Sequence, residues 1–302
     1  MSDPILSTAG LTFAYDDVVA LSDIALEVPP GRSGLVGANG AGKTTLLKLM
    51  LGILQPGSGT VQVLGSNIPA DTLKVRSRVG FMPEASCLPQ DQSAADFIGY
   101  SAELAGIPSK AARQRASDIL GLVGLAEERF RPMGEFSTGM AQRAKMAQAL
   151  VHGPDLLLLD EPTAGLDPEG RDEMLDLITR IGDLGINVIV SSHMLGDIER
   201  TCDWIVMLDG GKVLRQGPIE GLSDQGIAEV EVLGDASAVV AALEAAGAEV
   251  RWEGRHIAVD HPDDPFIAVR NAVATTGATI RSLGARTTSL EDIFLAEETH
   301  DE

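Results

Sequence analysis

A short glycine-rich segment constrains the fold of this 302-residue chain more than any other feature. Residues 37–44 read Gly-Ala-Asn-Gly-Ala-Gly-Lys-Thr and fit the pattern G-x-x-x-x-G-K-[ST] of a phosphate-binding loop. An apolar segment, residues 33–36, precedes the loop, and an apolar helical pattern, residues 46–50, follows it. From the composition of the chain, chance alone would produce the pattern about 0.01 times. We therefore interpret the segment as a phosphate site rather than as a glycine turn ahead of a helix.

The residues of this loop have separate predicted roles. Glycines let the chain curl so that backbone N–H groups point at phosphate oxygens. Lys43 is predicted to neutralise the β- and γ-phosphate oxygens and to serve catalysis, and the Thr44 hydroxyl is predicted to bind Mg²⁺. The predicted nucleotide contacts are Asn39, Gly40, Gly42, Lys43, Thr44 and Thr45.

A second motif lies at the end of a predicted buried strand. Residues 156–159 are four leucines, and Asp160 and Glu161 follow them directly. In phosphate-loop enzymes the first such carboxylate holds Mg²⁺, so Asp160 is the predicted metal ligand and Glu161 is the predicted general base. An apolar run that ends in aspartate is common at strand ends, and the upstream loop is what favours the catalytic interpretation.

Three further segments give the chain a family resemblance. Residues 136–140, Phe-Ser-Thr-Gly-Met, open a predicted helix upstream of Asp160. Residues 162–167 read Pro-Thr-Ala-Gly-Leu-Asp, and His193 follows the next apolar strand, residues 188–190. Together with the two motifs above, these segments resemble the nucleotide-binding subunit of an ATP-binding cassette (ABC) transporter.

The resemblance implies an ATPase that binds ATP and Mg²⁺ and works as a pair of cassettes. It implies that Ser137 and Gly139 contact the γ-phosphate held by the other cassette, and that Asp167 organises the interface between the two. It also implies that His193 contacts the γ-phosphate and takes part in catalysis. The plainer alternatives are a helix N-cap for Ser137 and a surface role for the histidine.

Two more positions are assigned by the resemblance. Tyr15 matches the aromatic residue that stacks on adenine, with Phe13 as its competitor and simple packing as the alternative. Glu84 stands where the family usually has a glutamine that reaches Mg²⁺ and the attacking water. A carboxylate can bind Mg²⁺, but it adds negative charge and cannot donate a hydrogen bond while ionised. This departure should affect the rate and the coupling of hydrolysis, unless Glu84 is only an exposed acid in a loop.

The apolar patterns predict two domains. Residues 1–220 are expected to form an α/β P-loop cassette with a parallel core sheet, an antiparallel β subdomain and a helical insert at about residues 90–150. Residues 221–302 follow the order β-α-β-β-α-β, which predicts a small accessory α+β domain of the ferredoxin-like class. A capping box that begins at Thr288 predicts a closing helix from Ser289.

Charge and hydropathy limit the partners. The formal net charge is −21, which would repel a phosphate backbone, so no nucleic-acid partner is expected. No segment approaches the ~18 apolar residues of a membrane span, so direct insertion into a membrane is not expected. Cys87 and Cys202 have no Cys or His partners at metal-ligand spacing and are interpreted as reduced, ordinary residues. The expected location is the cytoplasm, at the inner face of the cell membrane through a partner.

The resemblance favours a motor that powers a separate membrane permease. Phe136, Thr138 and Met140 depart from Leu-Ser-Gly-Gly-Gln, the usual signature sequence of the family, and this variant resembles cassettes of drug, lipid and polysaccharide exporters. Residues 288–295 resemble the end of the accessory domain in drug-export-type cassettes. The second cassette would be another copy or a close paralogue. The alternative is an ABC ATPase without a pore that regulates or assembles other proteins, and co-purification with a multispanning membrane protein separates the two hypotheses.

Overall fold

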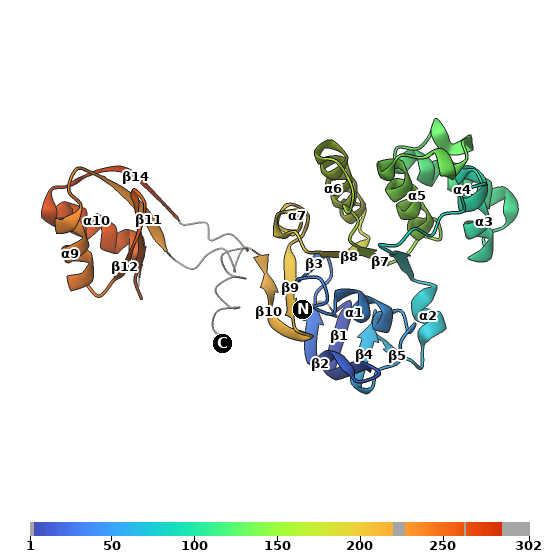
Figure 1. Ribbon diagram of the computed structural model, residues 1–302, viewed down its shortest axis with the longest axis horizontal. Coiled ribbons are helices and arrows are strands. Elements are labelled where there is room, and N and C mark those ends of the chain that lie inside the picture. The colour runs from blue at the N-terminus through green and yellow to red at the C-terminus, as the bar shows by residue number, and fades with distance from the viewer. Residues whose placement is uncertain (1–2, 220–226, 263, 286–302) are drawn as a thin grey trace. The chain divides into compact units, whose positions relative to one another are not determined.

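Two separate units make up the chain in the computed structural model, which describes residues 3–219, 227–262 and 264–285. The units are Met1–Ile219 and Glu220–Glu302, and each is described by itself (Figure 1). The helix expected from Ser289 and the exporter-like tail lie outside the described residues.

An antiparallel sheet forms the N-terminal part of the first unit. Its strands are β1 (Leu6–Tyr15), β2 (Val18–Val28), β4 (Ser58–Val63) and β5 (Ser66–Ile68), in the order β2-β1-β4-β5. All neighbours in this sheet pair antiparallel. The turn between β1 and β2 falls at Asp16, whose φ of 48° is the left-handed conformation that aspartate tolerates in tight turns. This sheet is the predicted antiparallel subdomain.

A second sheet carries the parallel strands that the leucine and valine runs predict. Its strands are β3 (Arg32–Val36), β6 (Val79–Met82), β7 (Leu156–Asp160), β8 (Asn187–Ser192), β9 (Trp204–Asp209) and β10 (Lys212–Pro218), in the order β10-β9-β3-β8-β7-β6. Every pair is parallel except β10 with β9. All residues of β7 are buried, as continuous apolar strands in a covered parallel sheet require.

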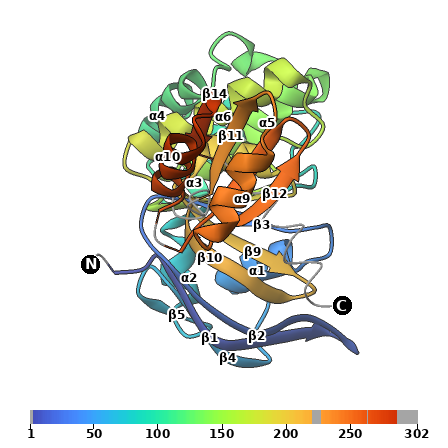
Figure 2. The same cartoon turned by 90° about the vertical axis from the view of Figure 1, so that its left-hand side faces the viewer.

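Helix α1 (Lys43–Met50) joins the two sheets into one core. It packs against β2, β4 and β7, and apolar side chains from both sheets surround it. The fully buried members of this core include Leu11, Leu21, Leu47, Leu49, Leu156 and Leu158. Figures 1 and 2 both place β1, β2 and β4 on the side of the unit away from α4 (Ser109–Leu122), α5 (Thr138–Leu150) and α6 (Pro168–Asp183).

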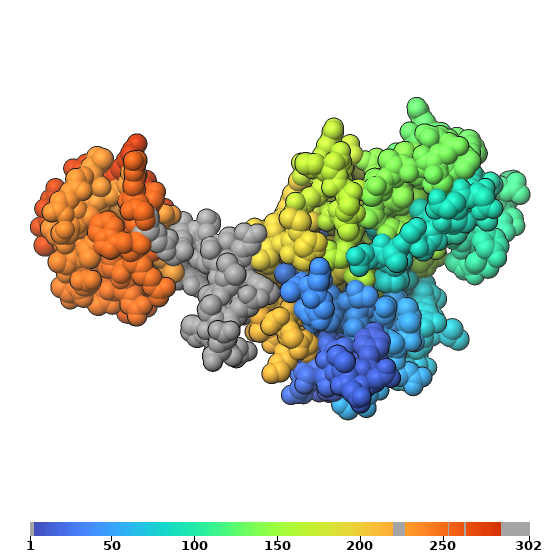
Figure 3. All heavy atoms as spheres, viewed as in Figure 1, coloured from blue at the N-terminus to red at the C-terminus, as the bar shows by residue number. Residues whose placement is uncertain are grey.

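Helices make up the insert and cover the parallel sheet. They are α1 (Lys43–Met50), α2 (Thr72–Arg76), α3 (Ala94–Leu104), α4 (Ser109–Leu122), α5 (Thr138–Leu150), α6 (Pro168–Asp183) and α7 (Leu195–Thr201), with 3₁₀ turns η1 (Glu128–Phe130) and η2 (Met133–Glu135). Helices α3, α4 and α5 pack together as the predicted insert. In the space-filling view, their teal and green atoms gather on a different side of the unit from the blue N-terminal strands (Figure 3).

The second unit has the predicted order of elements. They are β11 (Ala228–Leu233), α9 (Ser237–Ala245), β12 (Glu249–Glu253), β13 (His256–Asp260), α10 (Pro265–Thr276) and β14 (Thr279–Ala285). The strands pair antiparallel in the order β12-β13-β11-β14. Val230, Val239, Leu243, Val259 and Val269 are fully buried and give this unit its own core. None of the helices in the described part of the chain combines the length and apolar character that crossing a membrane requires.

Candidate functional site

The glycine-rich loop occupies the turn between β3 and α1. Gly40 and Gly42 have φ values of 89° and 105°, which side-chain-bearing residues rarely adopt. A Cβ at Gly42 would lie 2.6 Å from Leu21 and 2.8 Å from the Ala20 carbonyl oxygen. Both the backbone conformation and the close approach of β2 therefore require glycine at this position. The N–H groups at the start of α1 are left free of helical partners, as an anion site needs.

A cavity of about 510 Å³ lies over this loop, and we call it the loop pocket. Its lining brings together residues that are far apart in the sequence. These are Tyr15, Val18, Val19, Ala20, Ala38, Asn39, Gly40, Gly42, Lys43, Thr44, Thr45, Glu84 and Glu161. The pocket thus holds all six predicted loop contacts together with two acids from other segments.

The apolar end of the loop pocket comes from the first hairpin. Tyr15 is 42% exposed and lines the pocket with Val18 and Val19. Phe13 meets the Tyr15 ring edge-on, with 4.9 Å between ring centroids, but packs against the core instead of lining the pocket. Of the two aromatic candidates, Tyr15 is therefore the one placed to meet a bound base.

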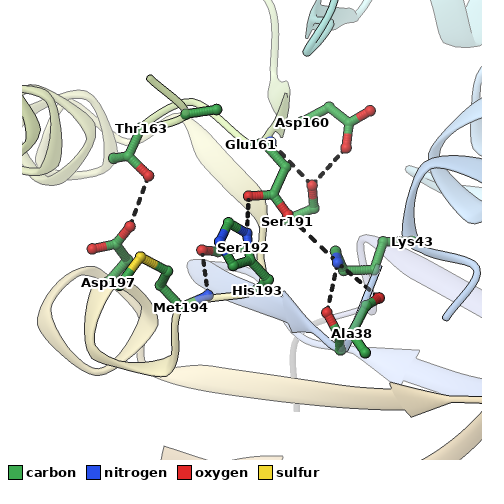
Figure 4. A network of polar contacts seen from close by, with 12 residues as sticks. Ala38, Lys43, Asp160, Glu161, Thr163, Ser191, Ser192, His193, Met194 and Asp197 are labelled. Atoms are coloured by element: carbon green, nitrogen blue, oxygen red, sulfur yellow. Dashed lines mark hydrogen bonds and ion pairs between the residues drawn. The ribbon is translucent and has the colours of Figure 1, made fainter. Parts of the chain in front are cut away.

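Lys43 forms the cationic centre of the loop pocket. Its Nζ donates hydrogen bonds to the carbonyl oxygens of Gly37 (2.6 Å) and Ala38 (3.3 Å) and lies 3.4 Å from Glu161 Oε1 (Figure 4). Both charged side chains are buried, and burying a charge is costly unless an opposite charge lies close by. The ion pair with Glu161 therefore stabilises the charged Lys43 ammonium group beside the loop, where a phosphate group would bind.

Asp160 lies at the end of β7, where two hydroxyl groups reach it. Thr44 Oγ1 donates to Asp160 Oδ2 at 2.9 Å, and Ser191 Oγ donates to Oδ1 at 2.7 Å (the latter in Figure 4). No cluster of three or more His, Cys, Asp or Glu side chains suited to a metal occurs among the residues that the structure describes. One carboxylate and one hydroxyl fit Mg²⁺, which usually binds few protein ligands and completes its shell with phosphate oxygens and water.

Glu161 is held in an unusual conformation. Its φ is 49°, a left-handed value that is uncommon outside glycine, and its N–H donates to the Ser191 carbonyl oxygen at 3.2 Å. His193 Nδ1 donates to Oε2 of Glu161 at 2.8 Å (Figure 4). The other oxygen, Oε1, is buried and accepts no hydrogen bond from any described residue. Oε1 faces the Lys43 ammonium group at 3.4 Å, so its charge is paired, but it can still accept a hydrogen bond from a water molecule.

Ser137, Gly139 and Asp167 lie in a different cavity, of about 440 Å³, which we call the signature pocket. It is formed by the N-terminal ends of α5 and α6 and the loop before α6. Ser137 Oγ accepts from the Met140 N–H at 3.3 Å, and Asp167 Oδ1 accepts from the Gly170 N–H at 3.1 Å. Both side chains are therefore helix N-caps, and a single chain keeps them apart from the loop pocket.

Several residues near these pockets belong to none of the sequence motifs. Ser191 supports Asp160, as described above. Asp197 is buried and accepts from Thr163 Oγ1 at 2.7 Å (Figure 4) and from Arg171 Nε at 2.6 Å, so it connects the segment after His193 with the segment after Glu161. The sequence indicates a role for Ser191 and Asp197 only in that they lie close to His193, on either side of it.

A phosphate-binding loop between a parallel strand and a helix, with acids at the end of the neighbouring strand, defines a P-loop nucleotide hydrolase. Residues 21–164 match the sequence model of the family described as ABC transporter. The Nod factor export ATP-binding protein I of Ralstonia nicotianae is 33% identical over 301 residues, which cover 97% of this chain and 94% of that protein. The chain therefore belongs to the ABC transporter family.

Two further similarities agree with this assignment. The bacitracin transport ATP-binding protein BcrA of Bacillus licheniformis is 36% identical over 220 residues, 72% of this chain and 71% of that protein. The structure of cbiO1 from Clostridium perfringens, described as part of the ABC transporter complex cbiONQ, has a TM-score of 0.68 at 30% identity. It covers 74% of this chain, and the match covers 92% of cbiO1. The chain is an ATP-binding subunit of an ABC transporter and an ATPase.

Proposed function

We propose that two copies of this ATPase, or one copy and a close paralogue, bind two Mg²⁺–ATP between them and power a separate permease of the export type. The observation that carries the proposal is the division of the predicted nucleotide contacts between two pockets. Lys43 and Thr44 line the loop pocket, whereas Ser137 and Gly139 line the signature pocket. In a two-fold symmetric pair, the loop pocket of each copy can face the signature pocket of the other.

The residues of the loop pocket divide the work of hydrolysis. Lys43 neutralises phosphate oxygens, and the backbone N–H groups before α1 bind them. Glu161 Oε1 accepts a proton from water as the water oxygen bonds to the γ-phosphorus and the bond from that phosphorus to the oxygen of ADP breaks. His193 orients Glu161 through the hydrogen bond from Nδ1 to Oε2, and its ring contacts the γ-phosphate. Thr44 and Asp160 would hold Mg²⁺, which would neutralise charge on the phosphates.

The names of two relatives support the transport role, and one of them supports the export direction. One is named for Nod factor export and another for bacitracin transport. The location that this function requires is the cytoplasmic face of the cell membrane, where the subunit would bind its permease. A nucleic-acid partner is not part of the proposal, because the net charge of −21 opposes phosphate-backbone binding.

Purification from the cells that encode the chain tests the transport role. The tagged subunit, solubilised in mild detergent, is expected to co-purify with a multispanning membrane protein, because a motor without its permease moves nothing. The isolated complex should also hydrolyse ATP faster when it is placed in lipid with its substrate. Purification free of any membrane protein from the same cells would instead support a regulatory or assembly ATPase.

The unusual Glu84 gives a prediction about charge in the loop pocket. Glu84→Gln removes one of two acidic side chains that line the pocket, so ATP should bind more tightly when Mg²⁺ is absent. Because Glu84 is exposed and water screens it, the expected gain is about two- to five-fold. Calorimetric titration with ATP in the presence and absence of Mg²⁺ measures it, with Glu103→Gln on α3 as a control. Unchanged or weaker binding without Mg²⁺ would place Glu84 away from the phosphates.

A further inference from the structure

Helix α5 buries two polar side chains among small apolar ones. Gln142 and Lys145 are each 5% exposed, whereas Ala144, Ala147 and Ala149 fill most of the remaining buried positions. Residues three apart lie on one face of a helix, so the two side chains project from the same face of α5, about one turn apart. Buried polar groups need partners, and Gln142 Nε2 and Lys145 Nζ each find theirs in a loop rather than in a neighbouring helix. Gln142 Oε1 accepts no hydrogen bond from a described residue.

Lys145 fastens α5 to the loop that carries Glu84. Its Nζ donates to the carbonyl oxygens of Pro83 (2.7 Å) and Glu84 (2.9 Å), just after β6 ends. Burial lowers the pKa of Lys145, and the neighbouring Cys87, Glu84 and Asp160 act in the opposite direction. The ammonium group thus fixes the backbone from which the Glu84 side chain enters the loop pocket.

Gln142 fastens the same helix to the loop before α6. Its Nε2 donates to the Ala164 carbonyl oxygen at 3.1 Å, and Gly165, Leu166 and Asp167, the next residues, line the signature pocket. The N-terminal end of α5 lines that pocket as well. One helix therefore holds the backbone of two loops, each of which shapes a different pocket.

We propose that Lys145 and Gln142 are positioning residues through which α5 couples the loop pocket to the signature pocket of the same chain. Nucleotide in the loop pocket moves or orders the loop that carries Glu84. Through its hydrogen bonds to that loop, Lys145 shifts α5. Through its hydrogen bond to Ala164, Gln142 then changes the conformation of residues 163–167. The proposal rests on the proposed use of the signature pocket by a second copy. It goes beyond that function by naming how one chain links its two half-sites.

A competing route runs along the chain itself. Glu161 lines the loop pocket and is followed directly by the segment that leads to the signature pocket. If that route carried the coupling, Lys145 could be removed without effect on residues 163–167. Substitution of Lys145 by methionine, which has similar length but no donor, distinguishes the two routes.

Hydrogen exchange of the full chain measures the coupling without a permease or a second copy. It is carried out with and without a slowly hydrolysed ATP analogue, at concentrations where light scattering reports a monomer. In the native protein the nucleotide is expected to slow exchange both at residues 37–45 and at residues 163–167. Lys145→Met should keep the first effect and reduce the second by about two- to thirty-fold, the range seen for substitutions within coupling networks.

Matched variants complete the test. Lys145→Arg keeps the positive charge and its donors and should restore much of the coupling, whereas Lys74→Met, at an exposed lysine of α2, should behave like the native protein. If Lys145→Met does not fold, Gln142→Met carries the same expectation from the other end. Full nucleotide-dependent slowing at residues 163–167 in the folded variant would overturn the proposal, as would its absence from the native protein. Neither result would touch the transport role, which co-purification tests separately.

Discussion

Glu161→Gln should bind ATP and almost cease to hydrolyse it. The amide keeps the size of the side chain but cannot accept a proton from water, and loss of a general base lowers the rate about 10²–10⁴-fold. Glu161 lines the loop pocket, His193 orients its Oε2, and no described residue donates a hydrogen bond to its Oε1, so Glu161 is the described acid best placed for this role. Single-turnover hydrolysis, with ATP binding measured in parallel, gives both quantities.

The same variant should accumulate as an ATP-bound dimer. If hydrolysis is what separates the two copies, a pair that cannot hydrolyse ATP should persist, and light scattering should report twice the monomer mass with ATP but not with ADP. Asp155→Asn is a suitable control, because that exposed acid pairs with Arg78 away from the loop pocket. Hydrolysis by Glu161→Gln at the native rate would remove Glu161 from the role of general base.

The architecture was predictable where apolar runs are long or motifs are specific. The leucines of β7 and the valines of β8 indicated buried parallel strands, and the six elements of the second unit appeared in the expected order. Strands β4 and β6 were harder to predict. In β4 only Val61 and Val63 are buried, and β6 has four residues, so neither has a periodic pattern long enough to recognise.

The part of the site that lies within sequence motifs was predictable. The loop residues, with Glu84 and Glu161, do line one cavity, as the motifs suggested. Their roles in binding and catalysis remain predictions that the variants test. The separation of Ser137 and Asp167 from that cavity follows from the resemblance, but the N-cap hydrogen bonds that orient them could be seen only in the structure.

The supporting residues could not be predicted because their partners are distant in the sequence. Lys145 lies 61 and 62 residues from the two carbonyl groups that it contacts. Residues 144–147 are all buried, so this part of α5 lacks the division into an apolar and a polar face that is typical of a surface helix. The sequence pattern therefore does not show that Lys145 is a buried lysine. Only tertiary structure reveals that this lysine points inward to a loop.

Damage placed on different copies should restore activity that neither variant has alone. Lys43→Ala removes the phosphate-binding ammonium, and Ser137→Arg fills the signature pocket, so each variant alone should lose about 10²-fold or more of its hydrolysis. In a mixed pair of the two variants, one composite site receives both changes and the other receives neither. The intact site should therefore hydrolyse ATP.

The matched control places both changes on one copy. When the native chain pairs with the Lys43→Ala/Ser137→Arg double variant, each composite site carries one damaged half. The same two substitutions then leave no intact site, although the pair contains one wholly native copy. A site built within a single chain would give the opposite order of activities, so the comparison does not depend on how strongly each change acts.

The ATPase rate of these two mixed pairs is the most direct measure of whether two copies share the nucleotide site. The pairs are isolated through two different tags and assayed before subunits exchange. If two copies share each nucleotide site, hydrolysis should be clear when Lys43→Ala and Ser137→Arg are on separate copies and slight when both are on one copy. Equal rates in the two pairs, or a faster rate when both changes are on one copy, would show that the two copies do not share the site.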